Sequence, residues 1–260
     1  MAEFKATLNL FDYYYAQLRK NLFARISSLR SVLRSLESGS HKDLSRPRPD
    51  SFPTVEFPVE IDANSQAEIE LGSAFADLID SFINFIDEVV SVTEINRKAS
   101  VRVPRKLIGN EILEFIIEHV QSEAKKIASD ASLSNPTKLN RFELSDFSKN
   151  ASLGYFNIRN GIRHHRRIAK KDITLLHHAL DLTIEGHDKK KRSIFGPGER
   201  VEGGERIWVG FKIRERSIQK DEKITLEEKE LEGAILSIEK VIAPEIVKSA
   251  SRMYKNHKNN

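Results

Sequence analysis

An apolar repeat across the first 36 residues is the strongest constraint on the fold of this chain. Apolar side chains recur every three or four residues, a spacing that places them along one face of an α-helix. The repeat consists of Phe4, Leu8, Phe11, Tyr15, Leu18, Leu22, Ile26, Leu29, Leu33 and Leu36. It predicts one long amphipathic helix, which ends at the Ser-Gly-Ser sequence that starts at Ser38.

Similar apolar spacings predict helices along most of the remaining chain. Pro104 suits the first turn of one of them, because the backbone N–H that proline lacks would have no partner there. Asn135 and Pro136 are predicted to break the chain between two helices. The predicted helices after the first cover about residues 72–97, 104–130, 145–165, 173–184 and 226–253.

Two segments differ from this helical pattern. Closely spaced prolines predict an extended, proline-rich arm over about residues 41–70. Glycines and alternating apolar residues predict a small β-hairpin over about residues 193–216, in which a strand at 207–214 pairs with residues 193–195. The predicted fold is mainly α. It is a single domain over residues 1–260, a helical bundle with a long N-terminal helix and a small β-hairpin insertion.

The composition is that of a globular protein with a hydrophobic core, since 39% of the residues are hydrophobic and 31% are charged. The chain has no cysteine, which excludes disulfides, thiolate metal sites and a cysteine nucleophile. The N-terminus does not resemble a secretory signal, and no apolar stretch is long enough to span a membrane. We therefore expect a cytoplasmic protein with no membrane partner.

Basic residues are concentrated in one part of the chain, although the net charge is only +4. Residues 163–171 read RHHRRIAKK without one acid, and residues 189–192 read KKKR. Such a run predicts a positive patch that a polyanion would bind. A solvated helix end followed by a loop would give the same pattern.

A short motif lies directly before and within this basic run. Arg159, Asn160 and His164 follow one another within one and a half helical turns, and His165 offers a second imidazole. An imidazole can transfer protons near neutral pH, and a guanidinium can bind a phosphate and its developing negative charge. These groups suffice to cleave an RNA phosphodiester without a metal ion.

The motif resembles that of the HEPN superfamily, whose members are α-helical bundles found in toxin–antitoxin pairs and in anti-phage defence systems. The resemblance rests on Arg159, on Asn160 directly after it, and on His164 four residues further on near the predicted end of a helix. It implies a metal-independent endoribonuclease that needs no cofactor. Its reaction is attack of the ribose 2′-hydroxyl on the adjacent phosphate, which leaves a 2′,3′-cyclic phosphate.

The resemblance also implies a role for each residue of the motif. His164 or His165 would be the general acid or base, Arg159 would bind the scissile phosphate, and Asn160 would orient the imidazole or bind the ribose. The neighbouring cations would contact flanking phosphates of the RNA. These phosphate-binding residues would be Arg163, Arg166, Arg167, Lys170 and Lys171.

Arginine-to-histidine spacing alone identifies nothing in this chain, because Arg34 with His41 and Arg252 with His257 also satisfy it. Only the central motif has an asparagine directly after the arginine. On a regular helix Arg159 and His164 point about 140° apart, so we expect them not to meet unless the helix unwinds near Gly161 or two chains combine. The resemblance favours a homodimer with a composite active site.

Other functions remain open at the level of the sequence. The chain could be a non-catalytic HEPN-like module that binds RNA or a protein, or a helical protein whose first helix pairs with a partner. An antitoxin or regulatory protein is a further expected partner. His177 with Asp181 is a weak candidate for metal binding, since residues four apart share a helix face. We predict no metal site.

Overall fold

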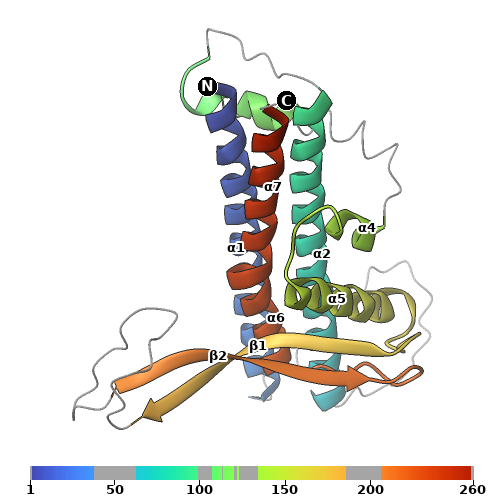
Figure 1. Cartoon of the computed structure of the whole chain (residues 1–260). Coiled ribbons are helices and arrows are strands. Elements are labelled where there is room, and N and C mark those ends of the chain that lie inside the picture. Colours follow the sequence, from blue (N-terminus) through green and yellow to red (C-terminus); the bar gives the residue numbers. More distant parts are fainter. Residues whose placement is uncertain are drawn as a thin grey trace, which may run out of the picture.

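Three long helical segments run alongside one another and form the body of the protein (Figure 1). The computed structural model describes residues 2–37, 63–98, 107–112, 114–119, 122, 134–185 and 206–258. The first two long segments are α1 (Ala2–Glu37) and α2 (Ala63–Lys98). The third consists of α6 (Glu228–Ser237), a π-helical turn (Ile238–Ile242) and α7 (Ala243–Lys258). The prediction of a mainly α fold is confirmed.

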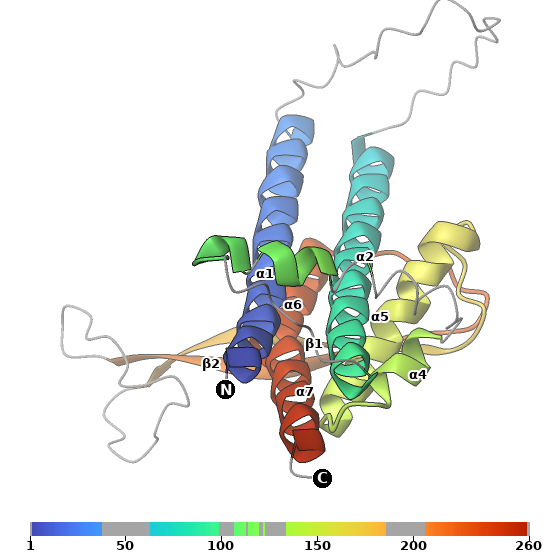
Figure 2. The same cartoon turned by 90° about the horizontal axis from the view of Figure 1, so that it is seen from above.

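Two smaller helices and a β-ribbon lie beside the long segments. Helices α4 (Asn135–Leu139) and α5 (Asp146–His164) lie on the side of α2 that faces away from α1 (Figure 2). Strands β1 (Ile173–Glu185) and β2 (Arg206–Ile218) pair antiparallel along their whole length. The ribbon crosses one end of the helical body and extends past it (Figure 1).

The start of strand β1 packs closely on helices α5 and α6. A Cβ atom at Gly154 would overlap the carbonyl oxygen of Thr174, and one at Gly233 would overlap the ring of His177. The Tyr155 hydroxyl donates to the Leu176 carbonyl oxygen at 2.7 Å. Glycine is needed at these two positions because atoms of β1 lie too close to leave room for a Cβ atom. The contacts hold α5 against β1.

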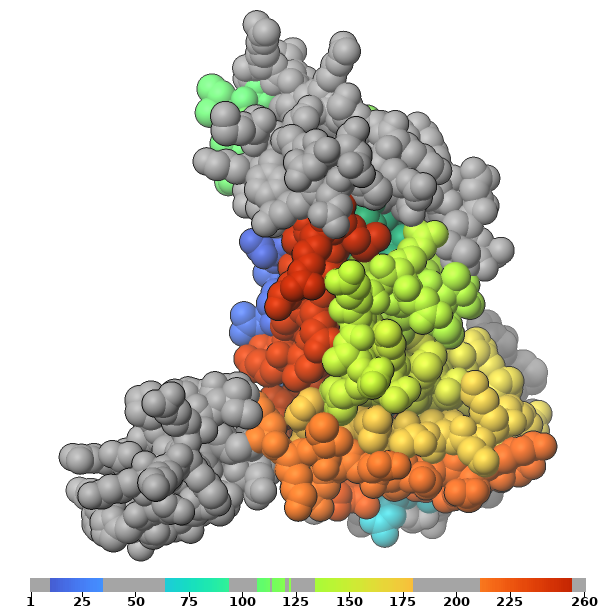
Figure 3. Space-filling model, in the orientation of Figure 1, coloured from blue at the N-terminus to red at the C-terminus, as the bar shows by residue number. Residues whose placement is uncertain are grey.

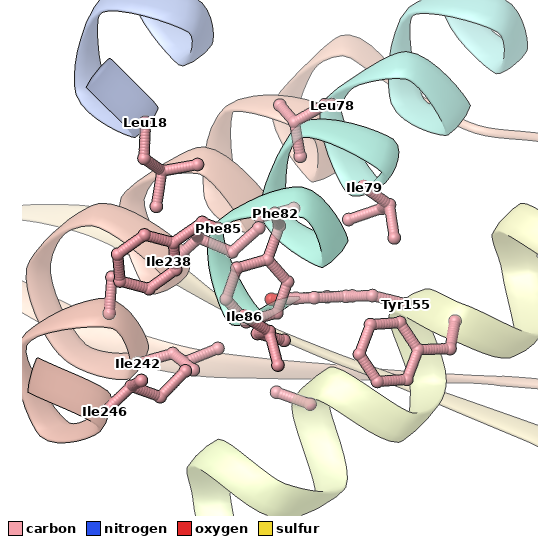
Figure 4. Packing of buried hydrophobic residues seen from close by; sticks show 14 of the residues in the cluster. Leu18, Leu78, Ile79, Phe82, Phe85, Ile86, Tyr155, Ile238, Ile242 and Ile246 are labelled. Atoms are coloured by element: carbon pink, nitrogen blue, oxygen red, sulfur yellow. The ribbon is translucent and has the colours of Figure 1, made fainter. Parts of the chain in front are cut away.

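The hydrophobic core lies between the three long segments and α5 (Figure 4). Leu18 of α1, Phe82 of α2 and Ile238 of the π-helical turn are buried together in it. Two aromatic pairs join α2 to α5. Phe75 meets Tyr155 edge-on with ring centroids 6.0 Å apart, and Phe82 stacks on Phe156 at 6.2 Å. The core therefore sets the position of α5 relative to α2.

The C-terminal helical segment changes register at the π-helical turn. The Ala243 N–H donates to the Ile238 carbonyl, five residues back, and so does not reach the Glu239 carbonyl. In the same register the donor for Glu239 would be Pro244, which has no N–H. The Tyr15 hydroxyl of α1 donates to the Glu239 carbonyl instead, at 2.6 Å. A side chain of another helix thus satisfies the acceptor that the turn leaves free.

The structure confirms the predicted helices at the N-terminus, at 72–97, at 145–165 and at the C-terminus, the last with the π-helical turn inside it. The predicted helix at 173–184 is wrong, because this segment is strand β1. Ile173, Leu175 and His177 are buried while Thr174 between them is exposed, which is the period of two that a strand requires. The partner of β2 is β1, and residues 193–195 lie outside the described residues.

Three further boundaries differ from prediction. Residues 63–70, assigned to the proline-rich arm, are helical and belong to α2, whereas 41–62 lie outside the described residues. Asn135 and Pro136 begin helix α4 instead of breaking the chain, since proline is tolerated in a first turn.

The helix predicted from Pro104 is described only in part. Residues 107–108 are not helical, and helix is present at 110–112, 114–119 and 122. Within the described residues no helix is long and apolar enough to cross a membrane.

Candidate active site

Helix α5 carries the Arg-Asn-x-x-x-His motif, and its packing determines which way the motif faces. The Ser145 side chain caps the helix by accepting from the Ser148 N–H at 3.3 Å. Ala151, Tyr155 and Ile158 are fully buried on its inner face. The outer face of α5 lies at the surface of the molecule, between α7 and the ribbon (Figure 3). Since the inner face is fixed by the core, the motif can turn only toward α2 or toward solvent.

The Arg159 guanidinium is the centre of the site. Its Nε donates to Asp80 Oδ1 of α2 at 2.7 Å, and its Nη1 donates to Asn160 Oδ1 at 3.0 Å. The same Nη1 lies 3.3 Å from His164 Nε2. A guanidinium only donates, so this contact is a hydrogen bond when Nε2 carries no proton.

The expectation that Arg159 and His164 could not meet on one helix is wrong. α5 remains helical through Gly161 to His164, and the two side chains are in contact within one chain. The long arginine side chain runs along the helix surface and brings Nη1 to the last turn, where the histidine ends the helix. The angular offset along α5 is therefore no reason to require a second subunit.

Three arginines, one of the motif and two of the basic run, bind acidic side chains of α2. Arg159 pairs with Asp80, and Arg163 pairs with Asp77 and with Asp80 Oδ2, the latter at 3.1 Å. Arg167 pairs with Glu68 at 3.3 Å. Two of the five predicted phosphate-binding cations, Arg163 and Arg167, are thus already occupied by carboxylates.

The α2 acids are shared with cations of other elements. Asp77 Oδ2 also accepts from Arg25 of α1 at 3.1 Å, and Glu68 also pairs with Lys223 at 3.0 Å. The acids therefore join four parts of the chain, which are α1, α2, the end of α5 with the turn after it, and the segment that follows β2. The positive patch that the basic run predicts is partly neutralised within the protein itself.

The turn after α5 has an uncommon backbone conformation. Arg166 and Arg167 have φ values of 51° and 65°, in the left-handed region that side chains usually avoid. The Gly161 carbonyl accepts from the N–H groups of both His165, at 3.2 Å, and Arg167, at 2.9 Å. The Arg167 guanidinium also donates to the Glu68 backbone carbonyl. These bonds hold the strained turn beside the motif.

The remaining candidate residues are open to solvent. Asn160, His164, Arg166, Lys170 and Lys171 are exposed, and His165 is half-buried. The rings of His164 and His165 lie 6.4 Å apart and meet edge-on. Among the described residues only His164 of these two contacts Arg159. The structure thus brings together Arg159, Asn160 and His164, and it leaves Arg166, Lys170 and Lys171 at the surface without an ion pair to the described residues.

Asp80 is the residue of this site that sequence reasoning missed. It lies 79 positions before Arg159, and the sequence around it is an ordinary amphipathic helix. Asp80 lies three residues after Asp77, and such a pair of acids is common on a helix surface and indicates no site. Only the packing of α2 against α5 shows that its carboxylate faces the motif.

His177 and His178 are part of the ribbon and have structural roles. His177 is buried, which lowers the pKa of its imidazole, and its Nδ1 has no hydrogen-bond partner among the described residues. The His178 N–H donates to Ser237 Oγ at 2.8 Å. On a strand residues four apart are roughly 13 Å apart, so His177 and Asp181 cannot share a metal ion. In the described part of the chain no cluster of three His, Asp or Glu side chains could hold one.

The chain matches no protein-family model, no curated protein and no solved structure. A function therefore has to be inferred from the geometry of the site.

Proposed function

We propose that the C-terminal end of α5 is the active site of a metal-independent endoribonuclease of the HEPN type. One observation carries the proposal. At an exposed helix end, the Arg159 guanidinium contacts both the Asn160 amide and the His164 imidazole through a single nitrogen, Nη1. A proton-transferring group and a phosphate-binding group thus lie side by side where an RNA strand can reach them.

The proposed reaction starts with the 2′-hydroxyl of the ribose. His164 Nε2, once it releases its contact with Arg159 Nη1, takes the hydroxyl proton as the 2′-oxygen attacks phosphorus, and the bond from phosphorus to the 5′-oxygen breaks. The products are a 2′,3′-cyclic phosphate and a 5′-hydroxyl, which requires one proton for the leaving oxygen. Arg159 would offset the charge that develops on the non-bridging oxygens, an effect typically of about 10²–10³ in rate for one donor.

The structure suggests a different role for Asn160 from the one expected from sequence. Its Oδ1 accepts from Arg159, so the amide helps to orient the guanidinium and does not contact the imidazole in this arrangement. Its amide nitrogen is left to donate to a ribose or phosphate oxygen of the substrate. The Asn160 side chain therefore links the arginine to the bound RNA in this proposal.

The attraction for RNA would come mainly from Arg166, Lys170 and Lys171. They are exposed and lie beyond the motif, on the turn that leads from α5 to β1. Arg163 and Arg167 would contribute less, because carboxylates of α2 hold them. Contacts to phosphates carry affinity and little sequence information, so the RNA target would be chosen by other contacts.

A second copy of the chain would complete the site. This reaction needs a base for the 2′-hydroxyl and an acid for the 5′-oxygen, yet one chain brings only His164 to Arg159. His164 or His165 of a second copy would supply the other group. We therefore propose a homodimer that acts in a toxin–antitoxin or anti-phage defence system, with an antitoxin or regulatory protein as a further partner.

One observation favours a second candidate function, a non-catalytic HEPN-like module that binds RNA or protein. The pairs Arg159–Asp80, Arg163–Asp77 and Arg167–Glu68 follow one another along α2 and along α5 with the turn after it. Such a row would hold two helices together whether or not any reaction occurs. In this case Arg159 only forms one more ion pair between helices, and His164 is a solvent-exposed residue at the end of a helix.

Cleavage of RNA in EDTA separates the two functions. A 5′-labelled single-stranded RNA is incubated with the purified protein, and its ends are tested for 2′,3′-cyclic phosphate. We expect cleavage that is lost in Arg159→Ala and in His164→Ala, and that fails on a strand with 2′-deoxyribose. Arg252→Ala serves as the control, since Arg252 is an exposed arginine with one ion pair, on α7.

Two results would contradict the nuclease. One is tight binding of RNA without cleavage by the unaltered protein. The other is cleavage that His164→Ala leaves intact, because the imidazole would then have no part in the reaction. Binding without cleavage would favour the non-catalytic module.

A further inference from the structure

One carboxylate of α2, that of Asp80, holds two arginines of α5 at once. Its Oδ1 accepts from Arg159 Nε at 2.7 Å, and its Oδ2 lies 3.1 Å from the terminal guanidinium nitrogen of Arg163. Each oxygen therefore serves a different arginine. The carboxylate itself contacts neither Asn160 nor His164 among the interactions of the described residues.

The core holds the Asp80 backbone in place relative to α5. Leu78, Ile79 and Phe82 surround Asp80 in the sequence of α2 and are fully buried (Figure 4). Phe82 stacks on Phe156 of α5, three residues before Arg159. The two ends of the Asp80–Arg159 ion pair are thus fixed by packing that lies beneath them, and only the side chains can move.

The ion pair determines the direction of the Arg159 guanidinium. A guanidinium is planar, so a bond at Nε to a fixed carboxylate restricts where its terminal nitrogens point. In the structure this places Nη1 against Asn160 Oδ1 and His164 Nε2. Without the carboxylate, a long and partly exposed side chain would lose its anchor and regain its rotamer freedom.

The two arginines depend on Asp80 to different degrees. Arg163 has a second carboxylate, that of Asp77, whereas Asp80 is the only acid paired with Arg159 among the described residues. Removing Asp80 therefore frees Arg159 and leaves Arg163 held. Removing Asp77 affects Arg163 and Arg25 and leaves Arg159 in place.

We propose that Asp80 is a positioning residue of the site, which acts through Arg159 by holding its Nη1 beside His164. This proposal rests on the ribonuclease function proposed above. Asp80 would not touch the RNA. Its effect would be to keep the guanidinium aligned with the phosphate that the 2′-oxygen attacks, and misalignment on the order of 1 Å can cost about 10² in rate.

The neighbouring acid supplies a matched control for the test. Asp77 and Asp80 lie on the same helix and face, their side chains are 29% and 34% exposed, and each pairs with Arg163. Asp80→Asn and Asp77→Asn are therefore the same chemical change in nearly the same setting. Only the first removes the negative charge that pairs with Arg159 Nε.

The full-length variants are compared in the RNA cleavage assay in EDTA. We expect Asp80→Asn to lower kcat by about 10² with a small change in KM, and Asp77→Asn to stay within about 3-fold of the unaltered protein. Asp80→Glu, which keeps the carboxylate, should recover part of the loss. Equal losses in both variants that follow their melting temperatures would overturn the proposal, because the acids would then act only through stability.

A second measurement reports on the contact without any cleavage. In ¹H–¹⁵N spectra Asp80→Asn should move the Arg159 Nε resonance and the ring resonances of His164, whereas Asp77→Asn should leave both unchanged. Unmoved His164 resonances in Asp80→Asn would overturn the positioning role.

The two proposals fail in different ways. Full cleavage by Asp80→Asn would overturn the positioning role and leave the nuclease standing. If the unaltered protein does not cleave RNA, the nuclease is overturned, and with it any role of Asp80 in the reaction.

Discussion

The Tyr15 hydroxyl donates to the backbone carbonyl oxygen of Glu239 at 2.6 Å, and so joins α1 to the π-helical turn of the C-terminal segment. The acceptor has no donor within its own helix, because Ala243 bonds to Ile238 and Pro244 has no N–H. Arg19 strengthens the same junction by pairing with the Glu239 carboxylate at 2.8 Å. The register change in one helix is thus stabilised by side chains of another.

Tyr15→Phe should therefore destabilise the fold by about 1–2 kcal/mol, because it leaves the Glu239 carbonyl without a partner. Urea denaturation followed by circular dichroism measures this free energy of unfolding. Tyr13→Phe is the control, since Tyr13 is also half-buried on α1 and its hydroxyl makes no hydrogen bond to the described residues. Equal effects of the two changes would show that the bond to Glu239 adds nothing.

Gly154→Ala should destabilise the protein by about 2 kcal/mol, because the added Cβ would overlap the Thr174 carbonyl oxygen of β1. Alanine favours helices more than glycine, so the measured loss is what remains after that gain. Thermal unfolding compares this variant with Asn150→Ala, an exposed position on the same helix. A Gly154→Ala protein as stable as the unaltered one would mean that the ribbon does not pack on α5 as described.

Burial raises the pKa of Glu88, on α2, from 4.5 to about 7, and the neighbouring Asp87 adds to the effect. The folded chain then keeps a proton that the unfolded chain releases, so Glu88 lowers stability as the pH rises from 4.5 to 7. Glu88→Gln should stabilise the protein at pH 8.5, on the order of 1 kcal/mol after allowance for solvent screening, and change little near pH 4.

Urea midpoints at the two pH values test this dependence, with the exposed Glu114→Gln as the control. A stabilisation by Glu88→Gln that is the same at both pH values would contradict it. The gain would then come from packing and not from the charge of the carboxylate.

The exposed lysines after α5 should determine the salt dependence of RNA binding. Each of Lys170→Ala and Lys171→Ala should reduce the slope of log K against log salt concentration by about 0.7 on single-stranded RNA, since each removes one phosphate contact. Fluorescence anisotropy at several salt concentrations measures the slope. Lys248→Ala, an exposed lysine on α7, should leave it unchanged. A slope that neither lysine variant changes would place RNA elsewhere on the protein.

Apolar residues spaced three or four apart predicted the helices well, because burial of one helix face requires that spacing. The members of the predicted repeat from Phe11 to Leu33 are buried or half-buried, and α5 was predicted to within a residue at each end. β1 was misread because the spacing of Ile173, Leu176 and Leu180 also suits a helix. Only the pairing with β2 and the close contact at Gly154 show that the segment is extended.

The candidate site was predictable in its residues and not in its geometry. Arg159, Asn160 and His164 are close in sequence, so the motif alone suggested them as a candidate site. Their contacts depend on side-chain directions and on Asp80, which α2 brings from far along the chain. The same packing occupies Arg163 and Arg167, which the sequence suggested as free cations.

Because Arg159 pairs with a distant acid, the motif alone would not identify the same site in a related chain. The motif is one continuous segment, but the acid that pairs with its arginine lies on another helix, 79 positions away. A homologue could keep all six residues of the motif and lack the acid at the position of Asp80. In such a chain the same motif would contain an arginine without a fixed orientation. Conservation of the site would therefore have to be judged at both the motif and the position of the acid.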